Sequence, residues 1–355
     1  MEKKMKTIIL KVSIISLLFS GLYSQGSRMG TASSTQLQVV QGAQYLSGGG
    51  AVANSVGMDA AFWNPAGLAG SENSFDAIFS NRQYIADINS NFFGVSFNLL
   101  NLKMGLNVRS FDIGDINETT VFSPDGTGQV FTPNFSVIGA TGSKKLSDNT
   151  SVGVNVNYIR ESFGRVYSSG VSFDLGVQYK GLLTEALDVG FVLKNFGNPM
   201  KYDGEGLGIL ADASSGDRPE EYYKVDAASF DLPFAFDMGL SYNMAGVDLG
   251  FTYTSNYYAT DEMKFKASYG IGNIASLRVG YQLSAVAKDQ SEVGDGIQTV
   301  DEVDKDWYEN PFDGLSFGAS LSLSSFIGTN LILDYALLPA EGFDPNNVIA
   351  LRLAF

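Results

Sequence analysis

NVIALRLAF, residues Asn347–Phe355, is the stretch that decides the fold. Large apolar residues occupy every second position from Ile349 to Phe355, and small or polar residues, including Arg352, stand between them. In an extended strand these two sets fall on opposite faces. Strict alternation that ends on an aromatic carboxyl terminus is typical of outer-membrane barrels, whose apolar face meets lipid. The other face, with Arg352, is therefore expected to line the lumen.

The same alternation recurs along the chain from residue 74 onward. In 102–109 and 152–158, for example, large apolar residues alternate with Gly, Asn, Lys or Arg. A helical period cannot produce this pattern. It predicts fourteen strands, at 74–81, 91–99, 102–112, 131–144, 150–162, 168–180, 185–195, 231–243, 246–257, 262–271, 275–284, 314–323, 328–337 and 347–355.

The lengths of the predicted connections divide the barrel into two rims. Every link from an even-numbered strand to the next odd-numbered strand is short. An even strand number with short turns on the periplasmic rim and long loops outside is the outer-membrane pattern. The predicted fold class is therefore all-β, a 14-stranded antiparallel transmembrane barrel of the outer membrane. The predicted outer links include the long loops 113–130, 196–230, 285–313 and 338–346 and the short ones 163–167 and 258–261.

The first 24 residues have the features of a secretory signal peptide. Three lysines between positions 3 and 6 precede the mostly apolar run Val12–Leu22, and Ser24 is small enough to precede a cleavage site. A membrane anchor is the alternative, but the run is shorter than the roughly 20 residues that a spanning helix needs. We predict three segments: the signal peptide at 1–24, a plug at 25–73 and the barrel at 74–355.

The composition narrows the possible functions. The chain has no cysteine and no histidine, which excludes disulfides, Ser-His-Asp catalysis and His-ligated metals. The net charge is −15, and because residues 1–24 carry four lysines and one glutamate, the rest is near −18. So acidic a chain does not favour nucleic acid. Charged residues make up 17% of the chain, against about 25% in soluble proteins. No cofactor or metal is predicted.

Two alternatives to a non-enzymatic barrel have some support in the sequence. Arg109, Asp112 and Asp115 form a charge cluster near the outer rim, which an ordinary salt bridge explains better than an active site. We therefore predict no enzymatic activity. A soluble secreted all-β protein is the other alternative. The terminal Phe355 and aromatic residues at strand ends, such as Phe251, speak against it.

Residues 25–73 do not alternate, yet they are too apolar for a disordered tail. Because they precede the first strand on the periplasmic side, we expect them to lie inside the barrel as a plug. Pro65 fixes a turn, Asn64 can bond within that turn, and Gly67 allows a backbone angle closed to other residues. A stopper that only fills the lumen and a hatch that opens are both possible. The predicted hatch residues are Asp59, Phe62, Trp63, Asn64, Pro65 and Gly67.

Two further groups of residues are candidates for function. The polar face of the strands predicts lumen-facing side chains. The two longest outer loops offer candidate partner-binding residues, although loop 285–313, with nine acidic residues, could instead be a solvated loop or hold calcium. The lumen candidates are Arg109, Asn155, Asn157, Arg278 and Arg352. The loop candidates are Tyr222, Tyr223, Asp301, Asp304, Asp306 and Trp307.

The segment Asp59–Leu68, DAAFWNPAGL, resembles the Asn-Pro-Ala-Gly hatch signature of FadL-type barrels. More closely, the chain resembles the PorV/PorQ family of outer-membrane proteins along nearly all of its length after the signal peptide. The order and spacing of short matches carry this resemblance. They are Trp63–Leu68, Ala86–Ile88, Asp112–Asp115 with Thr119–Thr120, Leu146–Asp148 with Ser151–Gly153, Tyr158–Glu161, Asn195–Gly197 and Leu232–Pro233.

These resemblances imply two functions. PorV-like proteins belong to the type IX secretion system, in which they receive exported proteins from a translocon and pass them to the attachment machinery. FadL-like barrels let hydrophobic solutes such as long-chain fatty acids cross the outer membrane. The implied partners are secretion proteins and their cargo in the first case, and hydrophobic small molecules in the second. The secretion function is our first expectation and the channel is the alternative.

Overall fold

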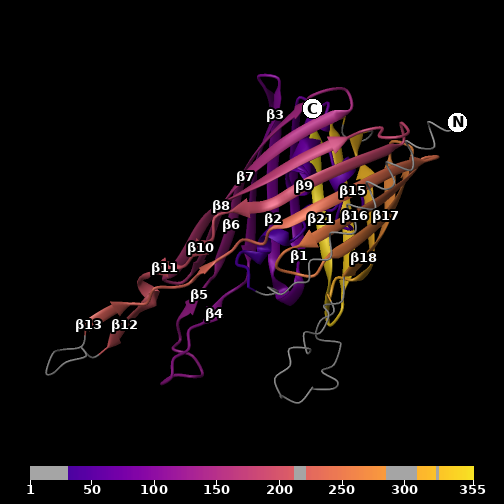
Figure 1. Ribbon diagram of the computed structural model, residues 1–355. Coiled ribbons are helices and arrows are strands. Elements are labelled where there is room, and N and C mark those ends of the chain that lie inside the picture. Colours follow the sequence, from indigo (N-terminus) through magenta and orange to yellow (C-terminus); the bar gives the residue numbers. More distant parts are fainter. Residues whose placement is uncertain (1–30, 212–220, 285–309, 325–327) are drawn as a thin grey trace, which may run out of the picture.

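The computed structural model describes residues 31–211, 221–284, 310–324 and 328–355. Fourteen antiparallel strands form a closed ring, which β1 and β21 complete by pairing with each other (Figure 1). The ring strands in chain order are β1 (Phe75–Gln83), β2 (Asn89–Leu99), β3 (Leu102–Asp112), β6 (Asn134–Lys145), β7 (Thr150–Phe163), β8 (Val166–Tyr179), β9 (Leu187–Gly197), β15 (Ala235–Met244), β16 (Val247–Asn256), β17 (Glu262–Ile271), β18 (Ala275–Ser284), β19 (Gly314–Ser322), β20 (Asn330–Ala340) and β21 (Phe343–Ala354).

All fourteen predicted strands are present, and the predicted fold class is confirmed. Strands β3, β17 and β18 have the predicted bounds, and the other strand ends differ by at most four residues. One predicted loop is wrong. Instead of the long connection 338–346, β20 and β21 continue to a turn at Glu341–Gly342. The two prolines of this stretch suggest a loop in the sequence. In the structure the ladder shifts register between Leu338 and Ala340, so that Pro339 lies in an irregularity of the pairing.

The two faces of the wall have opposite chemistry. Phe93, which points outward, is 51% exposed, whereas Asn107 on the inner face is 3% exposed. Soluble proteins rarely expose apolar side chains over a continuous area or bury so many polar ones. Outward aromatic side chains also pack across strands, as Phe251 and Phe265 do with ring centroids 5.2 Å apart. The outer face is therefore the surface that meets lipid.

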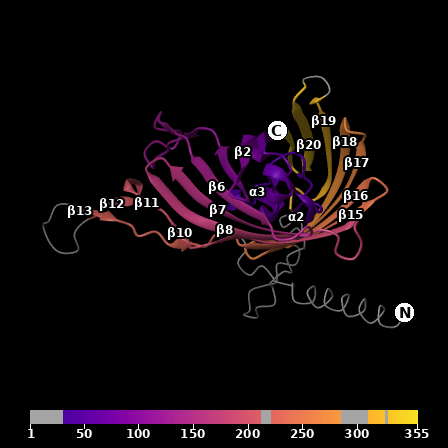
Figure 2. The same cartoon turned by 90° about the horizontal axis from the view of Figure 1, so that it is seen from above.

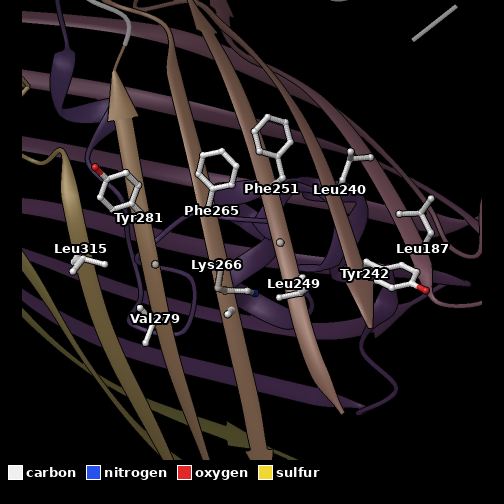
Figure 3. Close-up of a pocket in the computed structure, with 13 residues that line it drawn as sticks. Leu187, Leu240, Tyr242, Leu249, Phe251, Phe265, Lys266, Val279, Tyr281 and Leu315 are labelled. Atoms are coloured by element: carbon white, nitrogen blue, oxygen red, sulfur yellow. The ribbon is translucent and has the colours of Figure 1, made fainter. Parts of the chain in front are cut away.

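An apolar hollow interrupts this outer face over β9 and β15 to β19. Figure 3 looks onto the hollow from outside, with the rings of Phe251, Phe265 and Tyr281 on neighbouring strands. Gly250 and Gly280 also line it. At these glycines the wall is one backbone thick, and the plug lies behind it.

Two outer connections extend beyond the same rim as narrow hairpins (Figure 1). The shorter one contains β4 (Ile116–Asn117) and β5 (Val130–Phe131). The longer one contains β10 (Met200–Lys201) paired with β14 (Ser229–Phe230), β11 (Asp203–Gly204), and β12 (Gly208–Ala211) paired with β13 (Glu221–Lys224). In the part of the chain that the structure covers, no helix is long and apolar enough to cross a membrane.

The plug is a chain of short helices inside the ring (Figure 2). Its outer end lies near the extracellular rim, where the amide of Ser33 donates to the Asp231 carbonyl at 3.0 Å. Its inner end joins β1 at the periplasmic rim, where the amides of Ser74 and Phe75 donate to the Phe355 carbonyl. The predicted plug inside the barrel is confirmed. Its helices are η1 (Thr35–Gln38), α2 (Ala51–Asn54), η2 (Gly57–Asp59), α3 (Ala60–Trp63) and η3 (Pro65–Gly70).

Candidate functional site

Glycines on the inner wall hold the plug in direct backbone contact. Gly190 of β9 pairs across the ladder with Gly239 of β15, and α2 lies against both. A Cβ atom on Gly190 would be only 2.1 Å from the carbonyl oxygen of Val52. A second pair, Gly153 of β7 and Gly176 of β8, lies against Asn64 and Pro65 at the start of η3. Any side chain at these positions would push the plug off the wall.

Two further glycines, which line the outer hollow, contact the plug on the inner face of the wall. A Cβ on Gly250 would lie 2.5 Å from the carbonyl oxygen of Gly49, and one on Gly280 would lie 2.1 Å from Cβ of Ser47. The glycine contacts thus extend from β7 to β18, over a large part of the ring. They fix the position of the plug at the level of its helices.

Asn64 is the hydrogen-bonding centre of the plug. Its side chain is completely buried, and its Nδ2 donates to the carbonyl oxygens of Val52 at 2.8 Å and Val177 at 3.0 Å. Its Oδ1 accepts from the amide of Ala66 at 3.1 Å, within its own turn, and so caps η3. Pro65 opens that helix, where no backbone donor is needed. One amide side chain therefore joins two plug segments to β8.

Asn64→Asp is expected to loosen the plug, because a carboxylate of the same shape would lose the donor and face two carbonyl oxygens. A buried polar group left unpaired costs about 1–3 kcal/mol, and more when it is charged. The readout is the temperature at which the folded barrel loses its faster gel migration. Asn91→Asp is the matched control, since the Asn91 side chain accepts a bond from Asn81 and can still do so as a carboxylate. Equal lowering by both variants would contradict this role.

Gly67 is needed for a different reason than the sequence suggests. Gly67 does not adopt a left-handed backbone angle. A Cβ there would lie 2.0 Å from the carbonyl oxygen of Ser55, so close packing requires the glycine. The expected reason was wrong. Asp59 is buried at the end of η2 beside Gly42, and its Oδ1 has no hydrogen-bond partner in the described chain.

Phe62 and Trp63 pack edge to face, with ring centroids 5.3 Å apart. Trp63 is 1% exposed and belongs to an apolar cluster with Tyr45, Val52 and Val192, so it lies within the plug packing rather than at a free apex. Phe62 remains partly exposed. The indole thus holds the plug against the wall, while part of the phenyl ring remains accessible in the lumen.

Three cations from the outer halves of different strands surround this aromatic pair. The Lys194 ammonium lies 4.9 Å from the Phe62 ring centroid and 5.0 Å from that of Trp63. Arg109 lies 5.9 Å from the Phe62 ring, and Lys264 lies 5.9 Å from that of Trp63. Contacts at these distances are attractive, most of all away from water. Sequence reasoning missed Lys194 and Lys264, because a lysine on a polar strand face carries no special signal.

The predicted lumen residues form two groups on opposite sides of the plug. Arg109 donates to Asn157 at 3.1 Å, and both Asn155 and Asn157 donate to Asp174. Arg278 and Arg352 lie on β18 and β21 instead, where both face Asp334. The described residues do not form the expected rim salt bridge of Arg109 with Asp112 or Asp115, because Arg109 points into the lumen. Asp112 and Asp115 bond to Gly114 and Thr132.

The outer end of the plug is tied to the longer hairpin through Glu161 of β7. This buried carboxylate accepts from Ser34 Oγ at 2.5 Å, Gln36 Nε2 at 2.6 Å and Tyr202 Oη at 2.6 Å. Burial and then the Glu161 carboxylate raise the pKa of Tyr202, so the phenol stays a donor. An apolar cluster lies beside this carboxylate. It contains Leu37, Val137, Ile159, Met200 and Leu232.

Glu161→Gln is expected to detach the base of the longer hairpin from the plug. An amide offers only one accepting atom, so the donors from the plug and from Tyr202 cannot both be satisfied. Trypsin added to intact cells should then cut at Lys201 or Lys224 several times faster. Glu118→Gln, in the exposed β4–β5 hairpin, is the control and should leave the rate unchanged. Unchanged cleavage in Glu161→Gln would refute the link.

The predicted partner-binding residues are only partly described. Tyr222 and Tyr223 lie on β13 and are exposed, and Tyr222 Oη donates to the Glu205 carbonyl at 3.0 Å. Asp301, Asp304, Asp306 and Trp307 lie outside the described residues, as does most of the acidic loop that could hold calcium.

No protein-family model matches the chain, and no curated protein does. Solved structures match over most of its length. The toluene transporter TbuX of Ralstonia pickettii aligns with a TM-score of 0.52 and 14% identity, over 89% of this chain and 98% of that one. The toluene transporter TodX of P. putida gives 0.52 and 13%, over 89% and 98%. A Pseudomonas aeruginosa FadL homologue gives 0.50 and 14%, over 87% and 96%.

This chain has their fold. At such low identity the likeness extends to the 14-strand barrel and its plug and no further. Together with the apolar outer face, it identifies a multi-pass protein of the outer membrane of Gram-negative bacteria. The resemblance to PorV/PorQ proteins finds no support in these matches.

Proposed function

We propose that the protein is a passive channel for hydrophobic solutes that carry an acidic group, such as long-chain fatty acids. The observation that carries this proposal is the position of Phe62. Its partly exposed ring lies on the plug between Arg109 and Lys194, both in the outer halves of their strands. Lys194 is paired with Asp237 at 2.8 Å, whereas Arg109 Nε has no hydrogen-bond partner among the described residues. An aromatic surface beside such an arginine suits an apolar chain that ends in a carboxylate.

The surroundings of Phe62 and the fold support the same proposal. The apolar cluster around Leu37 lies at the outer end of the plug, at the base of the longer hairpin, and adds apolar surface on the outer side of the lumen. The structures with the same fold include two toluene transporters and a FadL homologue. The plug is the gate, and Phe62 with its two cations receives the solute above it.

The test is uptake of radiolabelled oleate by host cells that lack the gene and carry a plasmid copy. Phe62→Asp places a carboxylate where the solute would bind, and uptake should fall to the level of the deletion. Tyr222→Ala, in the outer hairpin, is the matched control and should restore full uptake. Both proteins should be present as folded barrels in the outer membrane. Full uptake in Phe62→Asp, or in the deletion, would refute the proposal.

A second candidate function is the binding of exported proteins, as the type IX secretion resemblance implies. The observation that favours it is the tip of the β4–β5 hairpin, where Val121 is 94% exposed and Phe122 is 97% exposed. Exposed apolar tips on a projecting hairpin suit a protein partner. Deletion of the gene should then remove a set of large exported proteins from the cell surface, as measured by mass spectrometry. An unchanged surface set would exclude this function.

A further inference from the structure

The plug contacts the barrel unevenly near the periplasmic rim. On β8 the inward side chain closest to that rim, Gln178, is buried against the plug, whereas the corresponding residues Lys145 of β6 and Asn243 of β15 are exposed. Ser276 of β18 and its cross-strand partner Ser320 of β19 are only partly buried. The side chain of Arg352 on β21 is 23% exposed. The inner wall is therefore partly accessible from the periplasm at these positions of β18, β19 and β21.

A charge cluster lines this accessible stretch, which we call the arginine seam: Ser276, Arg278, Ser320, Asp334 and Arg352. Asp334 is completely buried and accepts from Arg352 Nε at 2.6 Å and Nη2 at 3.0 Å. Arg278 Nη2 is 3.7 Å from the same carboxylate, too far for a hydrogen bond. One aspartate thus faces two arginines.

Arg278 is the unsatisfied member of the seam. It is 8% exposed, and its Nη1 donates to Ser276 at 3.1 Å and to Ser320 at 2.5 Å. Its Nη2 has no hydrogen-bond partner among the described residues. Within the same part of the chain, Asp59 of the plug forms no ion pair with either arginine. A buried guanidinium with a spare donor next to an exposed edge is stabilised by a bound anion.

We propose that the arginine seam is a carboxylate-binding site on the periplasmic side of the plug. The planar fork of an arginine matches a carboxylate. Ile332, the cross-strand partner of Arg352, is partly exposed and offers apolar surface for the start of an acyl chain. This inference rests on the proposed function, because the seam would receive the acidic group after it passes the plug.

The absence of cysteine allows a direct test in the full-length protein. Ser276→Cys places one thiol in the seam, and Ser147→Cys places one in an exposed periplasmic turn as the control. Both are modified in outer-membrane vesicles with a negatively charged sulfonatoethyl methanethiosulfonate and with its trimethylammonium analogue. The net positive seam should favour the anionic reagent at the seam thiol by about tenfold relative to the control. Sodium octanoate should slow the reaction only at the seam.

Adding Arg278→Gln to Ser276→Cys should abolish both the reagent preference and the protection. This variant keeps the Arg352–Asp334 pair, so the barrel should retain its heat-modifiable migration. An unreactive seam thiol, equal rates with both reagents, or no protection by octanoate would each overturn the site. If octanoate protects the seam thiol but deletion of the gene does not change oleate uptake, the carboxylate site stands and the transport proposal is refuted. Normal uptake without protection would refute the site alone.

Discussion

Trp63→Ala should make the outer membrane leaky. The indole is 1% exposed and packs with Tyr45, Val52 and Val192, and its removal leaves a cavity between the plug and β9. Truncating a buried tryptophan costs about 3–5 kcal/mol, which is enough to unseat a segment held by short helices. Host cells should become several-fold more sensitive to bile-salt detergents, and the purified barrel should show larger single-channel conductance in planar bilayers.

Trp63→Phe is the matched control for this prediction. It keeps an aromatic ring against Phe62 and the cation Lys194, so sensitivity should rise only slightly. If Trp63→Ala leaves both detergent sensitivity and conductance unchanged, the plug does not depend on this side chain. If Trp63→Phe is as leaky as Trp63→Ala, the contact of an aromatic ring with Phe62 and Lys194 is not what holds the plug.

Gly190→Leu should strongly destabilise the folded barrel. A Cβ there already lies 2.1 Å from the Val52 carbonyl oxygen, and the rest of a leucine side chain would enter α2. Overpacking commonly costs about 1–3 kcal/mol, and here the obstacle is backbone that cannot rotate away. The temperature of the heat-modifiable gel transition should drop markedly, and less folded barrel should reach the outer membrane.

Gly142→Leu tests whether any added bulk on a strand would do the same. Gly142 faces outward on β6, and a Cβ added there would meet only the sulfur of Met104, at 3.7 Å, among the described residues. The added side chain should meet lipid and leave the transition within a few degrees of the parent. Equal losses in both leucine variants would mean that strand propensity rather than the plug contact decides the outcome.

The ring could be predicted from the sequence because lipid imposes a strict code on each strand. Outward positions such as Ile349 and Leu351 must be apolar, while inward ones tolerate Arg352, so period two survives along the whole wall. The alternation does not predict the last hairpin. Pro339 and Pro345 suggest a loop there, although the strands continue past both prolines. The plug was predictable only as a break in alternation.

The site could be predicted in part, for a different physical reason. Asn64 and Trp63 stand in an unusual local sequence, but their contacts come from β8 and β9, more than a hundred residues away. Glu161 and Asp334 look like ordinary polar residues of their strands. Three donors converge on Glu161, and two arginines face Asp334. These partners come from distant parts of the chain, so no local sequence pattern predicts them.

The glycine contacts also dictate an order of assembly. A plug whose backbone touches the inner wall cannot enter the barrel once the ring of strands is closed. The ring must therefore close around a plug already in place, and the pairing of β1 with β21, with Phe355 accepting the amides of Ser74 and Phe75, joins the two ends of the ring. The plug is thus also the segment around which the barrel closes.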